Sequence, residues 1–340
     1  MKSISRRSFI NISCIAGGAV LLPSFLHGNI LLTTESFKSW YLYVQSRQCR
    51  TRLNAEVQLH AAQLAGIDTI VYNVHEDGAH YNSAFYTRCS DIEPGFDPLG
   101  YLVQRGNELG ICIYAWICPG VDCLQFDPTW DLAGKYGAPS TMHWLDFSIP
   151  AARERVRDIA ADITSKYIVG ICLDYIRYKS SWPWLPGNHP ELSAQDITTT
   201  VSMVQTAIAP RQLTVAVRAH DYQDTLQDWF YWLRLGIVDT VQPMAYAYRA
   251  GQIATWFARW DTDIPLDKIV PLLCLYNLYV TPPVIKTNAE LLIEINECKV
   301  YNIDTIGYAF FDSNGLNSKN RPLIRSLTFK NHNNLYKIPH

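Results

Sequence analysis

The chain has 340 residues, and 29 Lys and Arg nearly balance 31 Asp and Glu, for a formal net charge of −2. This balance excludes the basic footprint of a protein that binds nucleic acid or an anionic membrane. The sequence contains no heptads, internal repeats or low-complexity tract of the kind found in filaments and scaffolds. Its length suits one large domain.

The N-terminus has the pattern of an export signal. Arg6 and Arg7 precede an apolar run that is too short to cross a bilayer, and the surrounding residues resemble the twin-arginine motif. We therefore expect residues 1–28 to be a signal peptide, cut near Gly28. The mature protein is then periplasmic or extracellular, with no stable membrane anchor. The alternative is a slightly basic disordered N-terminus.

Strand-like and helix-like segments alternate through the rest of the chain. The helical segment 98–109, for example, begins with Asp97 as a cap and Pro98 in its first turn, and it ends at Gly110. Such alternation predicts a parallel sheet covered by helices, and eight units predict closure into a single (β/α)8 TIM-type barrel over residues 29–330, followed by a polar tail at 331–340. The expected strands are 40–44, 69–74, 111–117, 170–177, 213–220, 238–245, 269–276 and 305–311.

The long connections all follow strands. They come after the second, third and fourth strands, at 75–96, 118–147 and 179–192, whereas the returns from helix to strand are short. Long loops in a compact domain are usually functional, and the strand-to-helix loops of a barrel surround its active site. We therefore expect the functional site at this end.

The fourth strand carries the most informative residues. Its apolar run ends in Asp174, followed by Tyr175, Arg177 and Tyr178. A buried carboxylate is costly unless it is paired or hydrogen-bonded, so its position at a strand end indicates a function.

Several short motifs resemble a bacterial glycosyl-hydrolase-like barrel family, which includes a divisome-associated hydrolase of denuded peptidoglycan glycans. The resemblance covers about residues 40–311 and implies a TIM-type barrel that hydrolyses a glycosidic bond. The chain departs from the family at His75, where members often have arginine. The motifs are Asp97-Pro98-Leu99, Ala115-Trp116 with Pro119, Trp144-Leu145-Asp146, Leu173-Asp174-Tyr175-Ile176-Arg177-Tyr178 and Gln242-Pro243-Met244-Ala245-Tyr246.

Glycoside cleavage normally uses two carboxyl groups, one ionised and one that donates a proton. Asp174 fits the ionised group, as a nucleophile or as an electrostatic stabiliser, and Arg177 either keeps it ionised or binds a substrate oxygen. The alternative is that Asp174 caps the following loop or only pairs with Arg177. The leading candidates for the proton donor are Asp312 and Asp221; Glu76, Asp77 and Asp146 are weaker ones, the last because it directly precedes a helix.

The remaining candidate residues bind substrate. Sugar rings present apolar C–H faces to aromatic side chains, and their hydroxyl groups need polar partners. The substrate is a polysaccharide or oligosaccharide: the family implies a cell-wall glycan, and a dietary or host polysaccharide suits an exported enzyme equally well. The predicted binding residues are Trp116, Tyr246 and Tyr276 at strand ends, Trp182 and Trp184 in the loop after the fourth strand, and the hydrogen-bonding residues Arg218 and His75.

Two other functions compete with this interpretation. A non-catalytic sugar-binding barrel is favoured by the lack of an obvious second acid. A metal-dependent hydrolase would use His75, His80, His143 or His220, but the first strand lacks the paired histidines of barrel metalloenzymes. We therefore expect neither a metal nor a cofactor. A short disulfide between Cys118 and Cys123 is compatible with their spacing.

Overall fold

The computed structural model describes residues 40–75, 78–121, 127–132, 135, 143–166, 168–178, 189, 191–220, 223–260, 263–278, 281–303, 305–309 and 321–328. The predicted signal peptide and tail lie outside these ranges. Eight of the described strands form a closed barrel, and every pair of neighbours is parallel. The barrel strands are β1 (Trp40–Val44), β2 (Thr69–Asn73), β3 (Cys112–Ile117), β4 (Gly170–Leu173), β5 (Gln212–Arg218), β6 (Thr240–Met244), β7 (Leu272–Cys274) and β10 (Ile306–Ala309).

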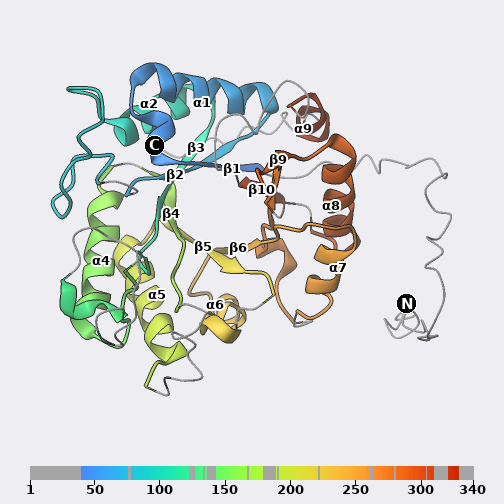
Figure 1. Cartoon of the computed structure of the whole chain (residues 1–340). Helices are drawn as coiled ribbons and strands as arrows, with labels where there is room; N and C mark the ends of the chain where they lie inside the picture. The colour runs from blue at the N-terminus through green and yellow to red at the C-terminus, as the bar shows by residue number, and fades with distance from the viewer. Residues whose placement is uncertain are drawn as a thin grey trace. The chain divides into compact units, whose positions relative to one another are not determined.

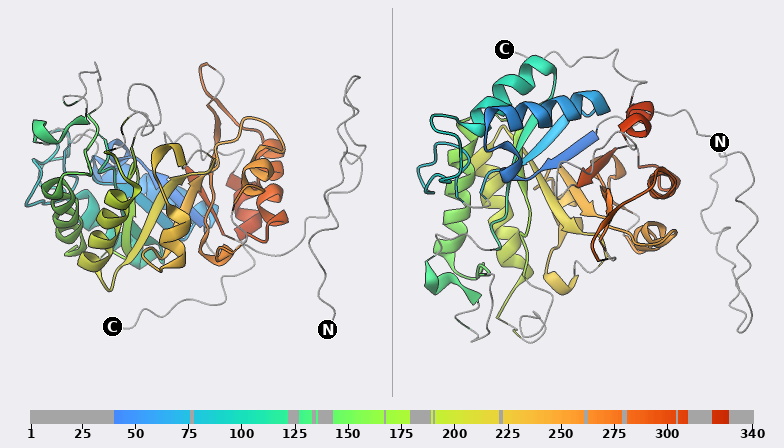
Figure 2. Two further views of the ribbon diagram at one scale, coloured as in Figure 1. Left: turned by 90° about the horizontal axis from the view of Figure 1, so that it is seen from below. Right: turned by 45° about the horizontal axis from the view of Figure 1, so that its top comes forward.

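The strands follow one another around the barrel in chain order, and β10 closes it against β1 (Figure 1). Helices follow the strands and surround the barrel in the two further views (Figure 2). The predicted (β/α)8 barrel is therefore confirmed. The helices are α1 (Arg52–Ala65), α2 (Pro98–Leu109), α4 (Pro150–Thr164), α5 (Ala194–Ile208), α6 (Trp229–Arg234), α7 (Gln252–Phe257), α8 (Asn288–Val300) and α9 (Arg321–Thr328).

The predicted boundaries of α2 are confirmed. Asp97 accepts a hydrogen bond from the backbone N–H of Gly100 at 3.1 Å, and Gly110 ends the helix in the left-handed conformation, with a φ of 71°. Among the helices that the structure describes, none has the length and apolar character needed to span a membrane.

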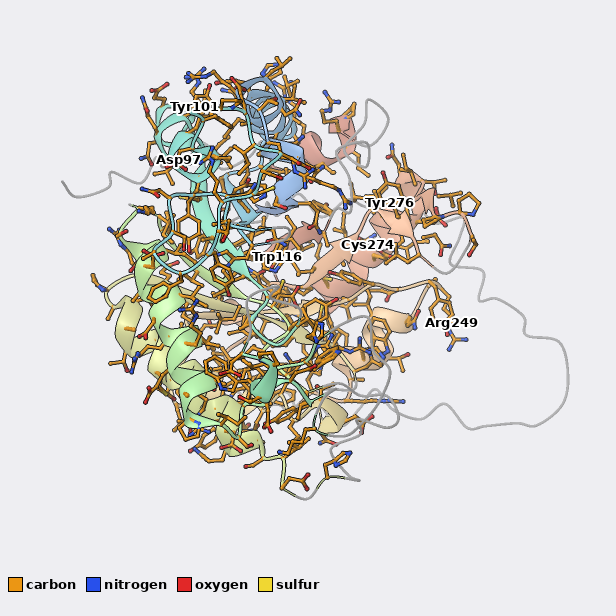
Figure 3. All side chains as sticks on the ribbon, turned by 60° about the vertical axis from the view of Figure 1, so that its left-hand side comes forward. Asp97, Tyr101, Trp116, Arg249, Cys274 and Tyr276 are labelled. Carbon is orange, nitrogen blue, oxygen red and sulfur yellow. The ribbon has the colours of Figure 1, made fainter. Side chains whose placement is uncertain are left out.

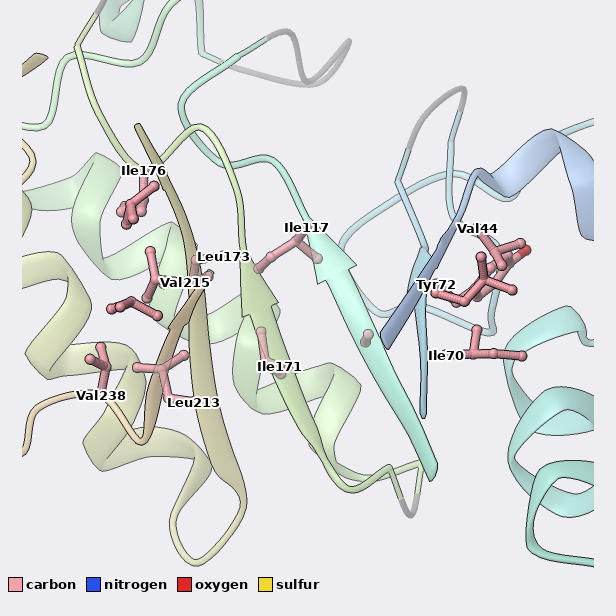
Figure 4. Packing of buried hydrophobic residues seen from close by; sticks show 14 of the residues in the cluster. Val44, Ile70, Tyr72, Ile117, Ile171, Leu173, Ile176, Leu213, Val215 and Val238 are labelled. Atoms are coloured by element: carbon pink, nitrogen blue, oxygen red, sulfur yellow. The ribbon is translucent and has the colours of Figure 1, made fainter. Parts of the chain in front are cut away.

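Successive strand residues alternate between two buried layers, as the two-residue period of a strand requires. In β1, Tyr41 and Tyr43 enter a cluster inside the barrel, whereas Leu42 and Val44 enter the larger cluster between the strands and the helices. Figure 4 shows part of this outer cluster. The inner layer contains Tyr41, Tyr43, Val71, Tyr114, Trp116, Cys172, Ala216, Val270 and Leu272.

Several strand boundaries differ from the sequence prediction, and the early ends of the fourth and seventh strands have a structural cause. The fourth strand was expected to continue to residue 177, but β4 ends at Leu173 because the chain turns sharply at Tyr175, which has a φ of 52°. The seventh strand was expected to continue to residue 276, but the chain leaves β7 after Cys274 and forms a separate hairpin. This hairpin consists of β8 (Tyr276–Asn277) and β9 (Val284–Ile285), and it projects from the barrel (Figure 2).

Candidate active site at the end of β4

Asp174 lies directly after β4, at the end of the barrel where the strands finish. Its backbone N–H donates to the carbonyl oxygen of Ile117 at 2.9 Å, and its Oδ1 accepts the backbone N–H of Tyr175 at 2.7 Å. The residue is only 6% exposed. The left-handed backbone of Tyr175 is a conformation that bulky residues rarely adopt, and it persists where the surrounding structure enforces it. The turn therefore holds Asp174 in one position.

The loop after β3 enforces this turn from one side. Gly120 lies so close to it that a β-carbon at this position would stand 1.8 Å from the carbonyl oxygen of Tyr175. The carbonyl oxygen of Gly120 in turn accepts the backbone N–H of Leu145 at 3.2 Å. Only a residue without a side chain fits between the two segments.

A buried glutamine fixes the turn from the side of β5. Gln227 donates its amide to the carbonyl oxygens of Ile176 and Ala216, both at 3.4 Å. Its Oε1 accepts the backbone N–H of Arg218 at 3.0 Å. One side chain thus connects the turn after β4 to the end of β5.

The surroundings of Asp174 act on its charge in opposite directions. Burial raises the pKa of this carboxyl from 3.8 to about 6, whereas the Arg177 guanidinium, the backbone N–H of Tyr175 and the Trp116 indole lower it. The indole N–H lies near the carboxylate but outside ordinary hydrogen-bonding geometry. At neutral pH the carboxyl is therefore mostly ionised, yet it remains close to its protonation midpoint.

Arg177 is held over two aromatic rings. Its Cζ lies 5.4 Å from the centre of the Trp144 ring and 4.7 Å from that of Tyr175, and the residue is 8% exposed. Cation–π contacts of this kind are strongest when water is excluded. Burial raises the pKa of the Tyr175 hydroxyl to about 12, and the charges of Arg177 and Arg218 act against this rise. Arg177 is thus the cation that acts on the Asp174 carboxylate.

A polar layer lies beneath Asp174 inside the barrel. The Tyr43 hydroxyl donates to Oε1 of Gln242 and lies 3.1 Å from the Cys172 sulfur. The Gln242 amide nitrogen and the Trp116 indole nitrogen are both buried, and neither has a hydrogen-bond partner among the described residues. Buried donors of this kind are rare in folded proteins, and an enclosed water molecule can satisfy them.

Tyr246 adds an aromatic ring from the residues that follow β6. Burial, the Cys274 thiol and the charge of Asp174 raise the pKa of its hydroxyl, in that order of size. Its ring packs against the inner cluster of the barrel, which includes Trp116 and Cys172. Figure 3 labels Trp116 and Cys274 in this part of the barrel.

Two of the predicted substrate-binding residues, His75 and Tyr276, contact side chains other than those described around Asp174. The His75 ring contacts Tyr86, with the ring centres 4.2 Å apart, and its Nε2 lies 3.1 Å from the Tyr81 hydroxyl. The rings of His75 and Tyr86, together with residues of α4, line a cavity of about 10 Å³, roughly the space that one water molecule requires. Burial lowers the pKa of His75 to about 3, so the ring is neutral. Tyr276 lies in the hairpin and packs against the outer cluster.

Asp146 has structural contacts. Its Oδ1 accepts the N–H and the hydroxyl of Ser148 just before α4, and its Oδ2 pairs with Lys135 at 2.6 Å. These contacts fit the alternative that it serves the start of the helix. The described ranges do not include Asp221, Asp312, Glu76, Asp77, Trp182, Trp184 or Cys123.

The described histidines are dispersed. His80 Nδ1 lies 3.0 Å from the Tyr72 hydroxyl, His143 pairs with Asp131, and His220 stacks on Trp256. Within the described ranges, no group of three His, Cys, Asp or Glu residues is placed to hold a metal ion.

Sequence reasoning missed three residues of this site. The close approach of Gly120 has only a weak signal in the sequence, the turn-forming pair Pro119-Gly120. Gln227 and Tyr43 have none, because their partners come from other strands and loops.

The fold and the site define a TIM-type barrel with a buried carboxylate at the end of its fourth strand. No family model matches the sequence. The chain is 21% identical to the glycosyl hydrolase DigH of Escherichia coli K12, over 59% of this chain and 61% of that protein. It therefore spans about three fifths of the length of the curated relatives that it matches. This similarity agrees with the family resemblance of the motifs.

Solved structures with the same fold include carbohydrate-processing enzymes. The glycoside hydrolase domain of PgaB (BpsB) from Bordetella bronchiseptica superposes with a TM-score of 0.61 at 14% identity, over 85% of this chain and 98% of that one. The alpha-L-fucosidase isoenzyme 2 of Paenibacillus thiaminolyticus gives a TM-score of 0.59 at 13% identity, over 85% and 48% of the two chains. At these identities the likeness shows the fold.

Proposed function

We propose that the protein is a glycoside hydrolase with Asp174 at its catalytic centre. The observation that carries this proposal is the enforced position of a buried carboxylate at the mouth of the barrel, where barrel enzymes keep their active sites. A carboxylate that served only as a cap would not need burial beside an arginine. The similarity to DigH and the fold shared with glycoside hydrolases support the same class.

In this proposal Asp174 acts in its ionised form. It stabilises the positive charge of the oxocarbenium-like transition state, either as a nucleophile or through space. Arg177 and the N–H of Tyr175 favour the ionised form and act against the effect of burial. The candidates for the proton donor to the leaving oxygen are still Asp221 and Asp312, each of which follows a predicted strand in the sequence.

The binding of a sugar is supported by the rings and donors around the carboxylate. Trp116 and Tyr246 supply aromatic surface at the inner cluster of the barrel. Arg218 is a donor at the end of β5. The substrate in this proposal is a polysaccharide, with peptide-stripped peptidoglycan glycan strands as the first candidate.

The test measures reducing ends released from a panel of glycans that includes peptide-stripped peptidoglycan. Asp174→Asn should abolish release while circular dichroism shows an intact fold. Asp239→Asn is the matched control, because Asp239 accepts the N–H of Leu213 at the opposite end of the barrel, and an amide can still accept that bond. An Asp174→Asn variant that cleaves as well as the parent would exclude Asp174 as the catalyst.

The alternative function is a non-catalytic sugar-binding barrel, in which Asp174 accepts hydrogen bonds from a bound glycan. The same panel separates the two functions. Glycan binding without release of reducing ends, in both parent and variant, supports the binding module.

We also propose export through the twin-arginine pathway, on the basis of the residues around Arg6 and Arg7. Replacing both arginines with lysine should retain the protein in the cytoplasm. Cell fractionation measures this, and unchanged export of the double variant would contradict it.

A further inference from the structure

The rim of the barrel beyond β6 and β7 is a connected unit. The Lys286 ammonium donates to the carbonyl oxygen of Ala247 at 3.0 Å, which ties the end of the hairpin to the residues after β6. Lys286 also pairs with Glu294 of α8, and both side chains are buried. Since a buried ammonium is costly without such partners, the hairpin and the β6 loop are held together firmly.

Ala247 and Lys286 each have an exposed neighbour in the chain. Tyr248 follows Ala247 and is 46% exposed, and Ile285 precedes Lys286 and is 38% exposed. The guanidinium of Arg249 lies 5.4 Å from the centre of the Tyr248 ring, and Arg249 projects outward from the loop in Figure 3. The exposed Tyr248 ring and the adjacent Arg249 guanidinium thus lie on a loop that the contact between Lys286 and Ala247 holds in place.

This rim continues the candidate active site. Tyr248 comes two residues after Tyr246, which packs against the inner cluster that contains Trp116 and Cys172, two residues before Asp174. Two residues extend the chain by at most about 7 Å. A polymer bound at Asp174 that leaves the site over β6 and β7 would meet Tyr248 next.

We propose that Tyr248 and Arg249 form an outer sugar-binding subsite, which contacts a glycan chain beyond the sugars bound at Asp174. This inference rests on the proposed function and adds that the protein acts on long chains. The Tyr248 ring provides a flat apolar surface for a sugar ring, and Arg249 provides hydrogen-bond donors for its hydroxyl groups. The Lys286–Glu294 pair positions the loop that carries them.

The test measures dissociation constants by titration calorimetry in an Asp174→Asn background, so that no substrate is consumed. The probes are peptide-stripped peptidoglycan oligosaccharides and chitin oligosaccharides, each from the disaccharide to the octasaccharide. Tyr248→Ala should weaken binding of the octasaccharide about tenfold, a typical effect of losing one aromatic contact, and leave the disaccharide unchanged. Tyr248→Phe should bind like the parent, because it keeps the ring.

Tyr231→Ala is the matched control, since Tyr231 is 42% exposed on α6, and it should bind every probe like the parent. Equal weakening at all chain lengths in Tyr248→Ala, or no weakening, would overturn the outer subsite. So would a parent that binds neither series. Failure of the proposed function is a separate result. If longer glycans bind more tightly but the protein with Asp174 intact releases no reducing ends, the outer subsite is supported and the hydrolase is excluded.

Discussion

Gly120 touches the backbone of Tyr175 so closely that the two segments leave no room for a β-carbon. This contact joins the loop after β3 to the strained turn after β4. The carboxylate of Asp174 comes directly before that turn, so its position depends on a residue that bears no functional group.

We expect Gly120→Ala to damage both stability and activity. The added methyl group must displace the backbone that carries Tyr175, and overpacking of this kind costs about 1–3 kcal/mol. Displacement of the turn also moves Asp174, so glycan hydrolysis should fall further than the loss of stability accounts for. Urea unfolding and reducing-end release measure the two effects.

Gly110→Ala is the control for this substitution. Gly110 also has a positive φ, but no atom lies within 4 Å of a β-carbon built there. It should cost roughly 1–2 kcal/mol through its left-handed backbone conformation alone and leave activity intact. Equal activity in the two variants would show that the Gly120 contact does not position Asp174.

Asp174 is expected to cost stability in its ionised form. Burial raises its pKa from 3.8 to about 6, so the folded state binds a proton more tightly than the unfolded state does. Stability therefore falls as pH rises from about 4 to about 6, by about 3 kcal/mol in total. Asp174→Asn should remove this slope and be more stable than the parent above about pH 6.

Thermal unfolding of the parent and of Asp174→Asn across this pH range measures the effect. A variant that is less stable than the parent above pH 6 would mean that the folded site favours the charged carboxyl. Such a result would agree with a purely structural ion pair with Arg177.

Arg177 should set the pH dependence of activity. If Asp174 acts in its ionised form, activity rises with pH, with a midpoint of about 6. The Arg177 charge lowers that pKa, so Arg177→Gln should move the midpoint upward by roughly one pH unit. Arg177→Lys keeps the charge and should move it much less. Activity that falls through pH 6 in the parent would assign Asp174 as the proton donor instead.

The sequence alone predicted the barrel because its signals are local. Apolar runs such as those of β4 and β5, the Asp97 cap and the Gly110 stop each act within a few residues. Asp174 was also identified, since a carboxylate that ends an apolar strand is conspicuous in the sequence. Its backbone partner Ile117 was not, because the pairing of β3 with β4 joins residues that lie far apart in the chain.

The surroundings of the carboxylate depend on contacts that no local pattern encodes. Gln227 precedes a short helix, and nothing near it in sequence indicates that it holds Ile176 and Arg218. His75, in contrast to Gln227, was singled out in the sequence. Its place after β2 predicts a substrate contact, which stays a prediction, and the sequence did not indicate that its ring lies against Tyr86 beside α4.

The buried pair of Lys286 and Glu294 should be strongly coupled. Lys286→Met leaves the Glu294 carboxylate buried without its cation, which costs about 3–5 kcal/mol. Burial already raises the pKa of Glu294 to about 7, and the Lys286 ammonium lowers it, so removal of the ammonium raises that pKa further. The ionised Glu294 carboxylate then destabilises the fold of Lys286→Met, so the loss of stability should grow as pH rises.

The double variant Lys286→Met with Glu294→Leu separates coupling from simple loss of contacts. It replaces the pair with apolar side chains of similar size, and such replacements are often neutral or stabilising. We therefore expect its unfolding free energy in urea to return close to that of the parent and to lose its pH dependence near neutral pH. If the double variant is less stable than Lys286→Met, Glu294 stabilises the fold independently of Lys286, and the ion pair is not what anchors the rim.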